Sequence, residues 1–387
     1  MTYRVLLVGN YRLDQQMSML RYYDMLLEAL RSRNVAVTGI EPYSFFGKVS
    51  AGLLTKWLRY ADKYLLFPSQ LRRAIAAQKR IATRAGETLI IHITDHSNAP
   101  YLACAKSETV VVTCHDLLAV RGALGEDTDC PASPMGKMLQ AKILAHLRQA
   151  ALVVCVSKAT QSDLSRLAPE TPSTVIPLPL NQPYAVLPRE EIAARLSRVS
   201  RDLLNNPYIL HVGSSLRRKN REGLLRIFAR IAADFPGQLV FAGEELHPEQ
   251  RQLAAQLGIW SRVVEIKTPP SAVIEALYNS AHAFVFPSKT EGFGWPIIEA
   301  QACGCPVLAA RTTSLPEVVG DGGLLREIDD EAGFAEDLLA LQDSAVRARL
   351  VAKGFENLAR FDHAKIMEHY LETYQSLADQ PSPLPSR

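Results

Sequence analysis

The stretch Glu291-Gly292-Phe293-Gly294-Trp295-Pro296-Ile297-Ile298-Glu299 decides the fold. An apolar run, 282–288, precedes it and predicts a buried strand, while the Ala-rich sequence after it predicts a helix that stops at Gly304. A strand, a glycine loop and a helix in this order bring backbone N–H groups to a helix N-terminus, where they can bind an anion. Because Pro296 suits the first helical position, we expect Glu299 in the first turn and Glu291 at the end of the strand.

Short apolar runs recur on both sides of this stretch and alternate with helical patterns such as 18–31, 136–150 and 221–233. Most runs lack polar alternation, which is typical of parallel strands covered on both faces. Strand–helix alternation in two series predicts two doubly wound α/β domains. The predicted strands are 4–8, 89–94, 110–114, 152–156 and 174–177, then 209–213, 239–243, 263–266, 283–287, 307–310 and 323–325.

The Pro-punctuated stretch 177–207 separates the two series. We therefore predict an N-terminal domain over 1–183 and a C-terminal domain over 184–361. A helix over 362–378 and a disordered tail over 379–387 would follow. Ligands of doubly wound sheets bind at the carboxyl ends of the strands, so we expect the site in the cleft between the domains.

Composition narrows the class of protein. The 387 residues are 48% hydrophobic and 21% charged, as in soluble globular proteins. No apolar run approaches the roughly 18 residues of a spanning helix, and the N-terminal run is too short for a signal peptide. The six cysteines have no C-x-x-C spacing, so we interpret them as reduced residues of a cytoplasmic protein without a metal site.

The net charge of +3 divides unequally. Residues 1–180 carry 21 Lys and Arg against 14 Asp and Glu, and the remainder carries 22 against 26. A basic first half without a recognition motif favours an anionic surface or acceptor over nucleic acid.

The segment 48–84 concentrates this charge, with nine Lys and Arg, one acid (Asp62) and interleaved aromatic residues. Such a basic amphipathic insertion can lie on an anionic membrane face, which would place the protein at the inner face of the membrane. The alternative is a helical hairpin that packs on the first domain with a solvated basic rim.

A second loop predicts a phosphate site. His211 to Asn220 follows a strand and opens a helix, Gly213 allows a sharp exit, and Arg218 with Lys219 bring two positive charges to the helix start. A diphosphate needs such a donor fork, point charge and helix dipole. Two basic residues alone are usually just solvated. The Glu291 loop follows only three strands further along the same predicted domain, and this favours the phosphate site.

The two glutamates accept hydrogen bonds, so they suit hydroxyl groups. We assign Glu299 to a ribose and Glu291 to a sugar, with the amides of Gly292, Phe293 and Gly294 as donors to the anion. Taken singly, Glu291 also fits an exposed loop acid, and Glu299 fits an acid favoured by the helix dipole.

In the first domain, His115 ends a predicted strand and could contact a sugar hydroxyl or transfer a proton. The alternative is a helix start with Asp116 as N-cap. Gly9, Asn10 and Tyr11 end the first strand and are candidates for the acceptor side. They lack a G-x-G-x-x-G run, so a dinucleotide site there is weakly supported.

These motifs resemble the retaining glycosyltransferases of family 4, which have the GT-B fold of two Rossmann-like domains. The resemblance rests on the E-x7-E motif 291–299 with its continuation 300–307, on Ser314 to Asp321, on Arg218-Lys219-Asn220, on Cys114-His115-Asp116-Leu117 and on Cys155-Val156-Ser157-Lys158. The histidine element is similar to the mannosyltransferase-like branch. Two departures are Pro177-Leu178-Pro179-Leu180 after the linker strand and Asn10-Tyr11 in place of a glycine pair.

The resemblance implies that a sugar moves from a nucleotide-diphosphate donor, GDP-mannose or a UDP-sugar, to an acceptor hydroxyl with retained configuration and no cofactor or obligate metal. It implies that Arg218 and Lys219 stabilise the leaving diphosphate, that Glu291 and His115 contact the transferred sugar, and that the C-terminal helix returns to the first domain. The acceptor would be a glycan, a lipid-linked molecule or a small molecule, as in polysaccharide or glycolipid biosynthesis. The alternatives are a nucleotide-sugar epimerase of the same fold and a non-catalytic nucleotide-sugar-binding subunit.

Overall fold

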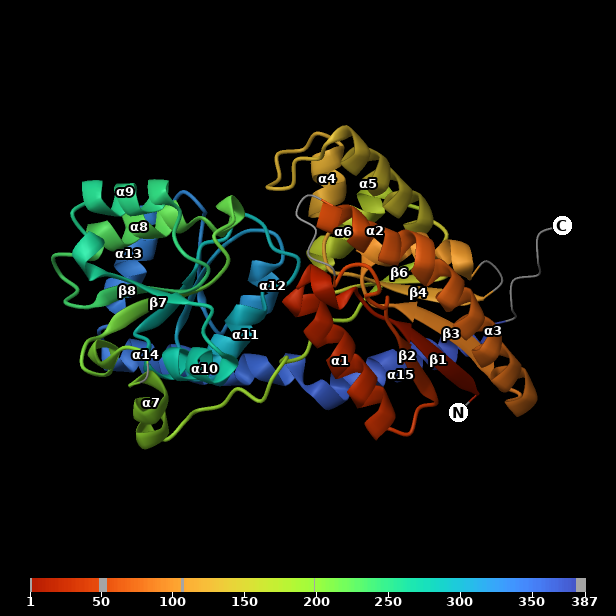
Figure 1. Ribbon diagram of the computed structural model, residues 1–387. Helices are drawn as coiled ribbons and strands as arrows, with labels where there is room; N and C mark the ends of the chain where they lie inside the picture. Colours follow the sequence, from red (N-terminus) through yellow and green to blue (C-terminus); the bar gives the residue numbers. More distant parts are fainter. Residues whose placement is uncertain (1, 49–53, 106–107, 198, 381–387) are drawn as a thin grey trace. The chain divides into compact units, whose positions relative to one another are not determined.

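The computed structural model describes residues 2–48, 54–105, 108–197 and 199–380 (Figure 1). The chain forms two compact units: Met1–Pro177 with His363–Arg387, and Leu178–Asp362. The division falls after Pro177, whereas the sequence placed it after 183, because the linker residues Pro179 and Asn181 bond to the second unit. Part of the predicted tail, 381–387, and residues 49–53 of the basic insertion lie outside the described residues.

The first unit holds a parallel six-stranded sheet in the order β2-β1-β3-β4-β5-β6. Helices cover both of its faces, with α1 and α15 on one face and α3 with α5 on the other (Figure 1). The strands are β1 (Tyr3–Val8), β2 (Val37–Ile40), β3 (Thr88–Ile93), β4 (Thr109–Cys114), β5 (Leu152–Cys155) and β6 (Ser173–Val175). The helices are α1 (Met17–Ser32), α2 (Leu54–Ala61), α3 (Phe67–Ala85), α4 (Leu118–Ala123), α5 (Pro134–Leu147), α6 (Lys158–Leu167) and α15 (His363–Asp379), with short helical turns η1 (Arg12–Asp14), η2 (Asp62–Leu66) and η3 (His96–Cys104).

The second unit repeats this plan in the order β12-β11-β10-β7-β8-β9. Here α8, α9 and α13 cover one face, and α10, α11 and α14 the other (Figure 1). The strands are β7 (Tyr208–Gly213), β8 (Gln238–Gly243), β9 (Val263–Lys267), β10 (Ala283–Phe286), β11 (Val307–Ala310) and β12 (Leu324–Arg326). The helices are α7 (Arg189–Leu196), α8 (Arg221–Ile231), α9 (Pro248–Gln256), α10 (Ser271–Ser280), α11 (Trp295–Ala302), α12 (Leu315–Val319), α13 (Glu331–Ala340) and α14 (Ser344–Leu358), with turns η4 (Arg201–Leu204), η5 (Arg217–Lys219), η6 (Trp260–Arg262) and η7 (Ala359–Phe361).

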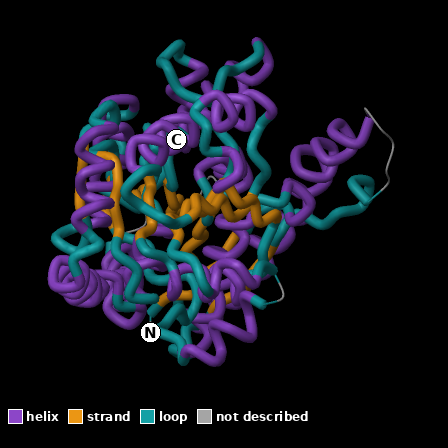
Figure 2. The backbone as a smooth tube through the Cα atoms, turned by 90° about the vertical axis from the view of Figure 1, so that its left-hand side faces the viewer, coloured by secondary structure: helices purple, strands orange, loops and turns teal. Residues whose placement is uncertain are grey.

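Local sequence accounts for these elements. In α1, Tyr22, Leu26 and Leu30 recur every four residues and are fully buried, so one side of the helix faces the sheet. In β4, Val110, Val111 and Val112 are all buried, as expected for a strand covered on both faces. The strands lie inside each unit with helices outside (Figure 2). The predicted fold class, two doubly wound α/β domains, is confirmed.

The basic insertion is not a hairpin. Residues 54–85 run as one continuous helix, α2 and α3 joined by the π-helical turn η2, because no Gly or Pro occurs between Leu54 and Phe67 to reverse the chain. The apolar face of α3, with Leu71 and Ile75, packs into the core of the first unit. Among the described residues, no helix combines the length and apolar character needed to cross a bilayer.

Candidate active site

The strand order of the second unit creates a ligand position at β7 and β10. The chain runs from β7 outward to β8 and β9, then returns to place β10 on the other side of β7. The loops after β7 and β10 therefore separate at a topological switch point, where doubly wound sheets bind ligands. A hydrogen bond from the Lys289 amide to the Arg218 carbonyl, 2.7 Å, ties these two loops together.

Three charged side chains meet there. Arg218 Nη1 donates to Glu291 Oε2 at 2.8 Å, and Lys219 Nζ donates to Glu291 Oε1 at 2.6 Å. Lys219 is 8% exposed and Glu291 9%, so the cluster is largely shielded from water. Two cations and one carboxylate leave an excess of one positive charge, which favours an incoming anion.

The charges within this cluster shift the pKa values of its own members. Burial alone would raise the pKa of the Glu291 carboxyl, but the charges of Lys219 and Arg218 outweigh burial and hold that pKa below its usual value. Burial lowers the pKa of the Lys219 ammonium group, and the charge of Glu291 opposes this shift. Each partner therefore keeps the other charged.

The loop after β10 has a fixed backbone. Gly294 has φ 109° and ψ 51° as N-cap of α11, a conformation that glycine adopts without strain. A Cβ there would also lie 3.1 Å from Leu315 Cδ2. Ser314 Oγ bonds to the carbonyl oxygens of Glu291 and Phe293 at 3.0 and 2.9 Å, and the Glu291 amide donates to Thr313 Oγ1 at 3.0 Å.

Two members of the predicted donor site have structural roles as well. The Phe293 ring packs edge-on against Phe361 with centroids 5.7 Å apart, so only its backbone is available to a ligand in this loop. Gly213 has φ 151° at the end of β7, and its carbonyl accepts from Arg221 Nη2 at 2.7 Å.

Glu299 does not lie in the first helical turn, as predicted, because α11 begins at Trp295 and Pro296 is its second residue. Its carboxylate, one turn further in, accepts from Asn181 Nδ2 at 2.7 Å and Tyr278 OH at 3.2 Å. Trp295 Nε1 donates to the Pro179 carbonyl at 2.8 Å. Glu299 therefore joins α10, α11 and the linker, and Asn181 is a site residue that sequence reasoning missed.

The first unit has its own switch point, between β1 and β3. Asn10, after β1, donates from Nδ2 to Asp95 Oδ2 at 2.5 Å and accepts at Oδ1 from Asn98 Nδ2 at 3.0 Å. Burial would raise the pKa of the Asp95 carboxyl, but His96, His115 and the hydrogen bond from Asn10 lower it overall. Asp95 follows β3 as His115 follows β4, so the rule that singled out His115 would also have found Asp95.

The other predicted acceptor-side residues are built into the fold. Gly9 donates its amide to the Ile40 carbonyl at 2.9 Å. Tyr11 is buried and its hydroxyl donates to Asp62 Oδ2 at 2.6 Å. An acceptor role for Gly9, Asn10 and Tyr11 stays a prediction.

His115 presents one uncommitted nitrogen. Its Nε2 lies 2.9 Å from the Thr94 carbonyl, which can only accept, so Nε2 carries the proton. Nδ1 is buried and has no hydrogen-bond partner among the described residues. Burial lowers the pKa of His115, so the ring is neutral at pH 7 and Nδ1 is an acceptor. Tyr22 packs edge-on against this ring, with centroids 4.9 Å apart.

Two family models match the sequence. One, described as Glycosyltransferase Family 4, matches residues 19–182, and the other, described as Glycosyl transferases group 1, matches residues 206–344. The first falls almost entirely on the first unit and the second lies within the second unit. The chain belongs to glycosyltransferase family 4.

Two curated proteins are similar in sequence to this family 4 member. The O-antigen chain mannosyltransferase B of Escherichia coli is 30% identical over 241 residues, 60% of this chain and 62% of that protein. The D-inositol 3-phosphate glycosyltransferase of Acidothermus cellulolyticus is 34% identical over 181 residues, 43% of this chain and 40% of that protein. The chain thus spans less than two thirds of the length of either relative.

Solved structures share the fold across nearly the whole chain. Sucrose-phosphate synthase from Thermosynechococcus elongatus has a TM-score of 0.71 at 22% identity and covers 97% of this chain and 99% of its own. Anabaena HepE, solved with UDP and glucose, has a TM-score of 0.70 at 18% identity and covers 97% and 100%. At these identities the likeness shows that this family 4 chain has the same fold.

Among the described residues, no group of three or more His, Cys, Asp or Glu side chains could hold a metal ion. The predicted site residues other than Gly9, Asn10, Tyr11 and His115 all belong to the second unit. Within that unit the structure brings together Arg218, Lys219 and Glu291, while Glu299 lies in the second turn of α11, eight residues after Glu291.

Proposed function

We propose that the protein is a retaining glycosyltransferase that moves a sugar from a nucleotide-diphosphate donor to an acceptor hydroxyl. The observation that supports this most is the Arg218–Glu291–Lys219 cluster at the switch point of the second unit. Its excess positive charge suits a diphosphate leaving group, because fixed charges in a water-poor site stabilise charge that develops in the transition state.

Each site residue then has a defined task. Arg218 and Lys219 neutralise the departing diphosphate, and Glu291 accepts from a hydroxyl of the transferred sugar once the diphosphate engages the two cations. Glu299, held by Asn181 and Tyr278, accepts from ribose hydroxyls. His115 Nδ1 accepts a hydrogen bond from a hydroxyl that the first unit binds.

The donor is GDP-mannose or a UDP-sugar. A relative named as a mannosyltransferase supports the first, and a solved structure with UDP and glucose supports the second. Retention of configuration and independence from metal and cofactor follow the family resemblance. We place the reaction in polysaccharide or glycolipid biosynthesis, in the cytoplasm with peripheral contact to an anionic membrane.

A thermal-shift series with GDP-mannose, UDP-glucose and ADP-glucose tests the donor. A ligand at 100 times its Kd stabilises the folded protein by about 2.7 kcal/mol, so one of the three should raise the melting temperature clearly. Donor hydrolysis by Lys219→Ala should then fall by about a hundred-fold, the usual scale for removing one group that stabilises transition-state charge.

Lys267→Ala is the matched control, since Lys267 is an exposed lysine of the same unit that pairs with Glu245. Sugar release that Lys219→Ala leaves unchanged would contradict the assignment. Conversion of the donor to a second nucleotide-sugar would identify an epimerase, and donor binding without hydrolysis or transfer would identify a non-catalytic subunit.

A further inference from the structure

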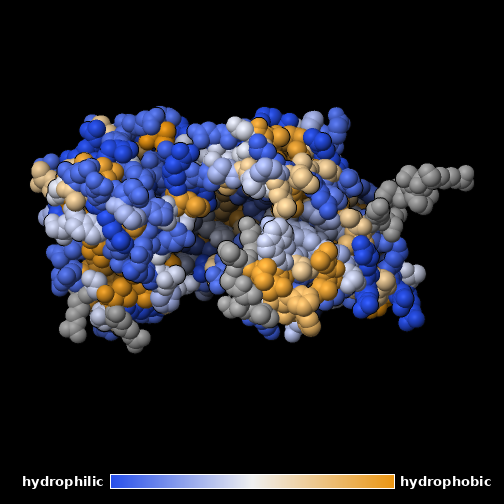
Figure 3. Space-filling view, turned by 45° about the horizontal axis from the view of Figure 1, so that its top comes forward, coloured by the Kyte–Doolittle hydropathy of each residue, from blue (hydrophilic) through white to orange (hydrophobic). Residues whose placement is uncertain are grey.

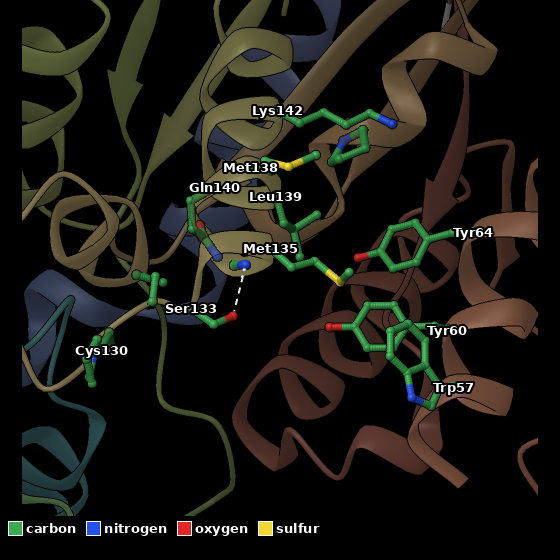
Figure 4. Close-up of a pocket in the computed structure, with 15 residues that line it drawn as sticks. Trp57, Tyr60, Tyr64, Cys130, Ser133, Met135, Met138, Leu139, Gln140 and Lys142 are labelled. Atoms are coloured by element: carbon green, nitrogen blue, oxygen red, sulfur yellow. Dashed lines mark hydrogen bonds between the residues drawn. The ribbon is translucent and has the colours of Figure 1, made fainter. Parts of the chain in front are cut away.

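A cavity of about 1040 Å³ opens on the first unit, and none of the residues assigned above lines it. One wall comes from α2 and η2, and the other from α5 and the loop before it (Figure 4). This volume lies just above the roughly 300–1,000 Å³ typical of small-molecule sites. Its size therefore admits a long ligand.

The first wall is aromatic. Trp57, Tyr60 and Tyr64 form a continuous row, with ring centroids 6.2 and 5.6 Å apart. In Figure 4 the hydroxyl groups of Tyr60 and Tyr64 point toward the opposite wall. Aromatic rings with a polar end suit a site that is apolar inside and wet at its mouth.

The opposite wall is aliphatic and holds Met135, Met138 and Leu139. Trp57 is 58% exposed, Met135 62% and Met138 74%. Large apolar side chains that converge on one exposed hollow indicate a binding surface rather than ordinary scattered exposure. Figure 3 shows hydrophobic residues on the surface of both units, and an orange patch of them lies on the first unit, right of centre.

The charge of the cavity selects the kind of ligand. Of the described residues that line it, Lys142 alone is charged. Asp62, the single acid of the aromatic segment, is fully buried and accepts from Tyr11 and the Gly47 amide. The site thus combines an apolar interior with positive charge and offers no lining carboxylate, which complements a molecule with a long apolar chain and an anionic head.

Two residues of the cavity lining follow closely, along the chain, the candidate site residues His115 and Asp95. Ala119 lines the cavity four residues after His115, so their Cα atoms lie within about 14 Å of each other. Pro100 also lines it and belongs to η3, which follows β3 and Asp95. Part of the cavity lining therefore lies near the loops that carry His115 and Asp95.

We propose that this cavity binds the apolar chain of a lipid-linked acceptor, with the acceptor phosphate at Lys142. This inference rests on the proposed function and specifies its acceptor class. The aromatic row and the methionines contact the chain, and Lys142 pairs with the phosphate. The sugar attached to that phosphate lies toward His115.

Dodecyl phosphate, kept below its micelle concentration, is the probe, and calorimetry on the full chain measures its binding. Met138→Glu should weaken binding by about ten-fold or more, because burying a methionine against an apolar ligand contributes roughly that factor. Leu65→Glu is the matched control, because Leu65 is equally exposed at 74% and does not line the cavity. Equal binding by both variants would overturn the proposal.

The charge has its own test. Lys142→Glu should weaken dodecyl phosphate binding several-fold and leave the uncharged dodecyl maltoside unaffected, whereas Lys137→Glu, an exposed lysine of the same helix, should change neither. Dodecyl phosphate should also protect the lining thiol Cys130 from maleimide and leave Cys104 as reactive as before. If Lys142→Glu lost affinity for both dodecyl phosphate and dodecyl maltoside, Lys142 would not recognise the phosphate, and the proposal would be contradicted.

Donor assays separate this inference from the proposed function. Met138→Glu and Lys142→Glu should hydrolyse the donor at the wild-type rate and show the wild-type thermal shift. Donor binding without any dodecyl phosphate binding would overturn only the cavity proposal, and the reverse result would overturn only the donor assignment. Binding to anionic vesicles alone, unchanged by Met138→Glu, would identify a membrane surface and also overturn the cavity proposal.

Discussion

Glu291 pairs with two cations in the candidate site, Arg218 and Lys219. Glu291→Gln keeps the shape of the side chain but leaves Arg218 and buried Lys219 without their counter-charge. Breaking a buried ion pair costs about 3–5 kcal/mol. We therefore expect the free energy of unfolding at pH 7 to fall by about 3 kcal/mol, measured by chemical denaturation.

The pH dependence of this loss has a defined sign. The pKa of Glu291 is lowered in the folded protein, so its stabilising contribution is present above the unfolded value near 4.5 and disappears as pH falls through the folded pKa. The difference between wild type and Glu291→Gln should therefore shrink below pH 4.5. Glu356→Gln, at an exposed position of α14, should cost little at any pH. A difference of the same size at pH 7 and pH 3 would contradict the ion-pair assignment.

Sequence reasoning at this scale identified residue types but not their partners. Glycines and charges around 218 and 291 stand out because diphosphate chemistry needs them at short range. The hydrogen bond from Tyr11 to Asp62 and that from Asn181 to Glu299 join residues 51 and 118 positions apart. Nothing in the local pattern at either end indicates such a contact.

At the scale of elements, strands were predicted well where they are long and uninterrupted. The exception is β2, Val37–Ile40, whose residues are all half-buried and include a glycine, so no apolar run marks it. The alternative of a helical hairpin over 48–84 was wrong because no break in the sequence pattern marks a turn within 54–85. The helical pattern of 54–85 is continuous, and charge alone does not turn a chain.

The C-terminal helix makes a testable contribution to the first unit. Tyr374, on α15, is fully buried, and its hydroxyl lies 2.6 Å from His92 Nδ1, while His92 Nε2 lies 2.8 Å from Thr113 Oγ1. Tyr374→Phe leaves a buried ring nitrogen unpaired, which costs about 1–3 kcal/mol. We expect hydrogen exchange to accelerate in β3 and α15 but not in β7 of the second unit.

Tyr43→Phe serves as the control, because Tyr43 is exposed and removal of its hydroxyl leaves no buried group unpaired. If exchange in β3 were as slow in Tyr374→Phe as in wild type, α15 would not stabilise the sheet through this hydrogen bond.

At the scale of the molecule, the order in which apolar runs and helical patterns alternate along the chain was enough to predict two doubly wound units. Strand–helix alternation admits few other arrangements. Strand order within each sheet was not predictable from segment order. The adjacency of β7 and β10 arises from a crossover that passes over two strands, and it is this adjacency that turns two separate motifs into one cluster.

The unequal charge of the two halves leads to the last prediction, on membrane contact. The inner face of α3 is packed in the core, while Arg72 and Arg73 are exposed on its outer face. A cation near an anionic membrane contributes about 1 kcal/mol, so Arg72→Glu with Arg73→Glu should lower binding to phosphatidylserine vesicles by at least about 30-fold, measured by sedimentation at low salt.

The control is the double variant Arg349→Glu with Lys353→Glu, which changes net charge equally on α14 of the second unit and should have a much smaller effect. Equal losses in the two double variants would show that binding follows net charge alone, and the absence of binding by the wild type would show that the basic face of α3 is only a solvated rim.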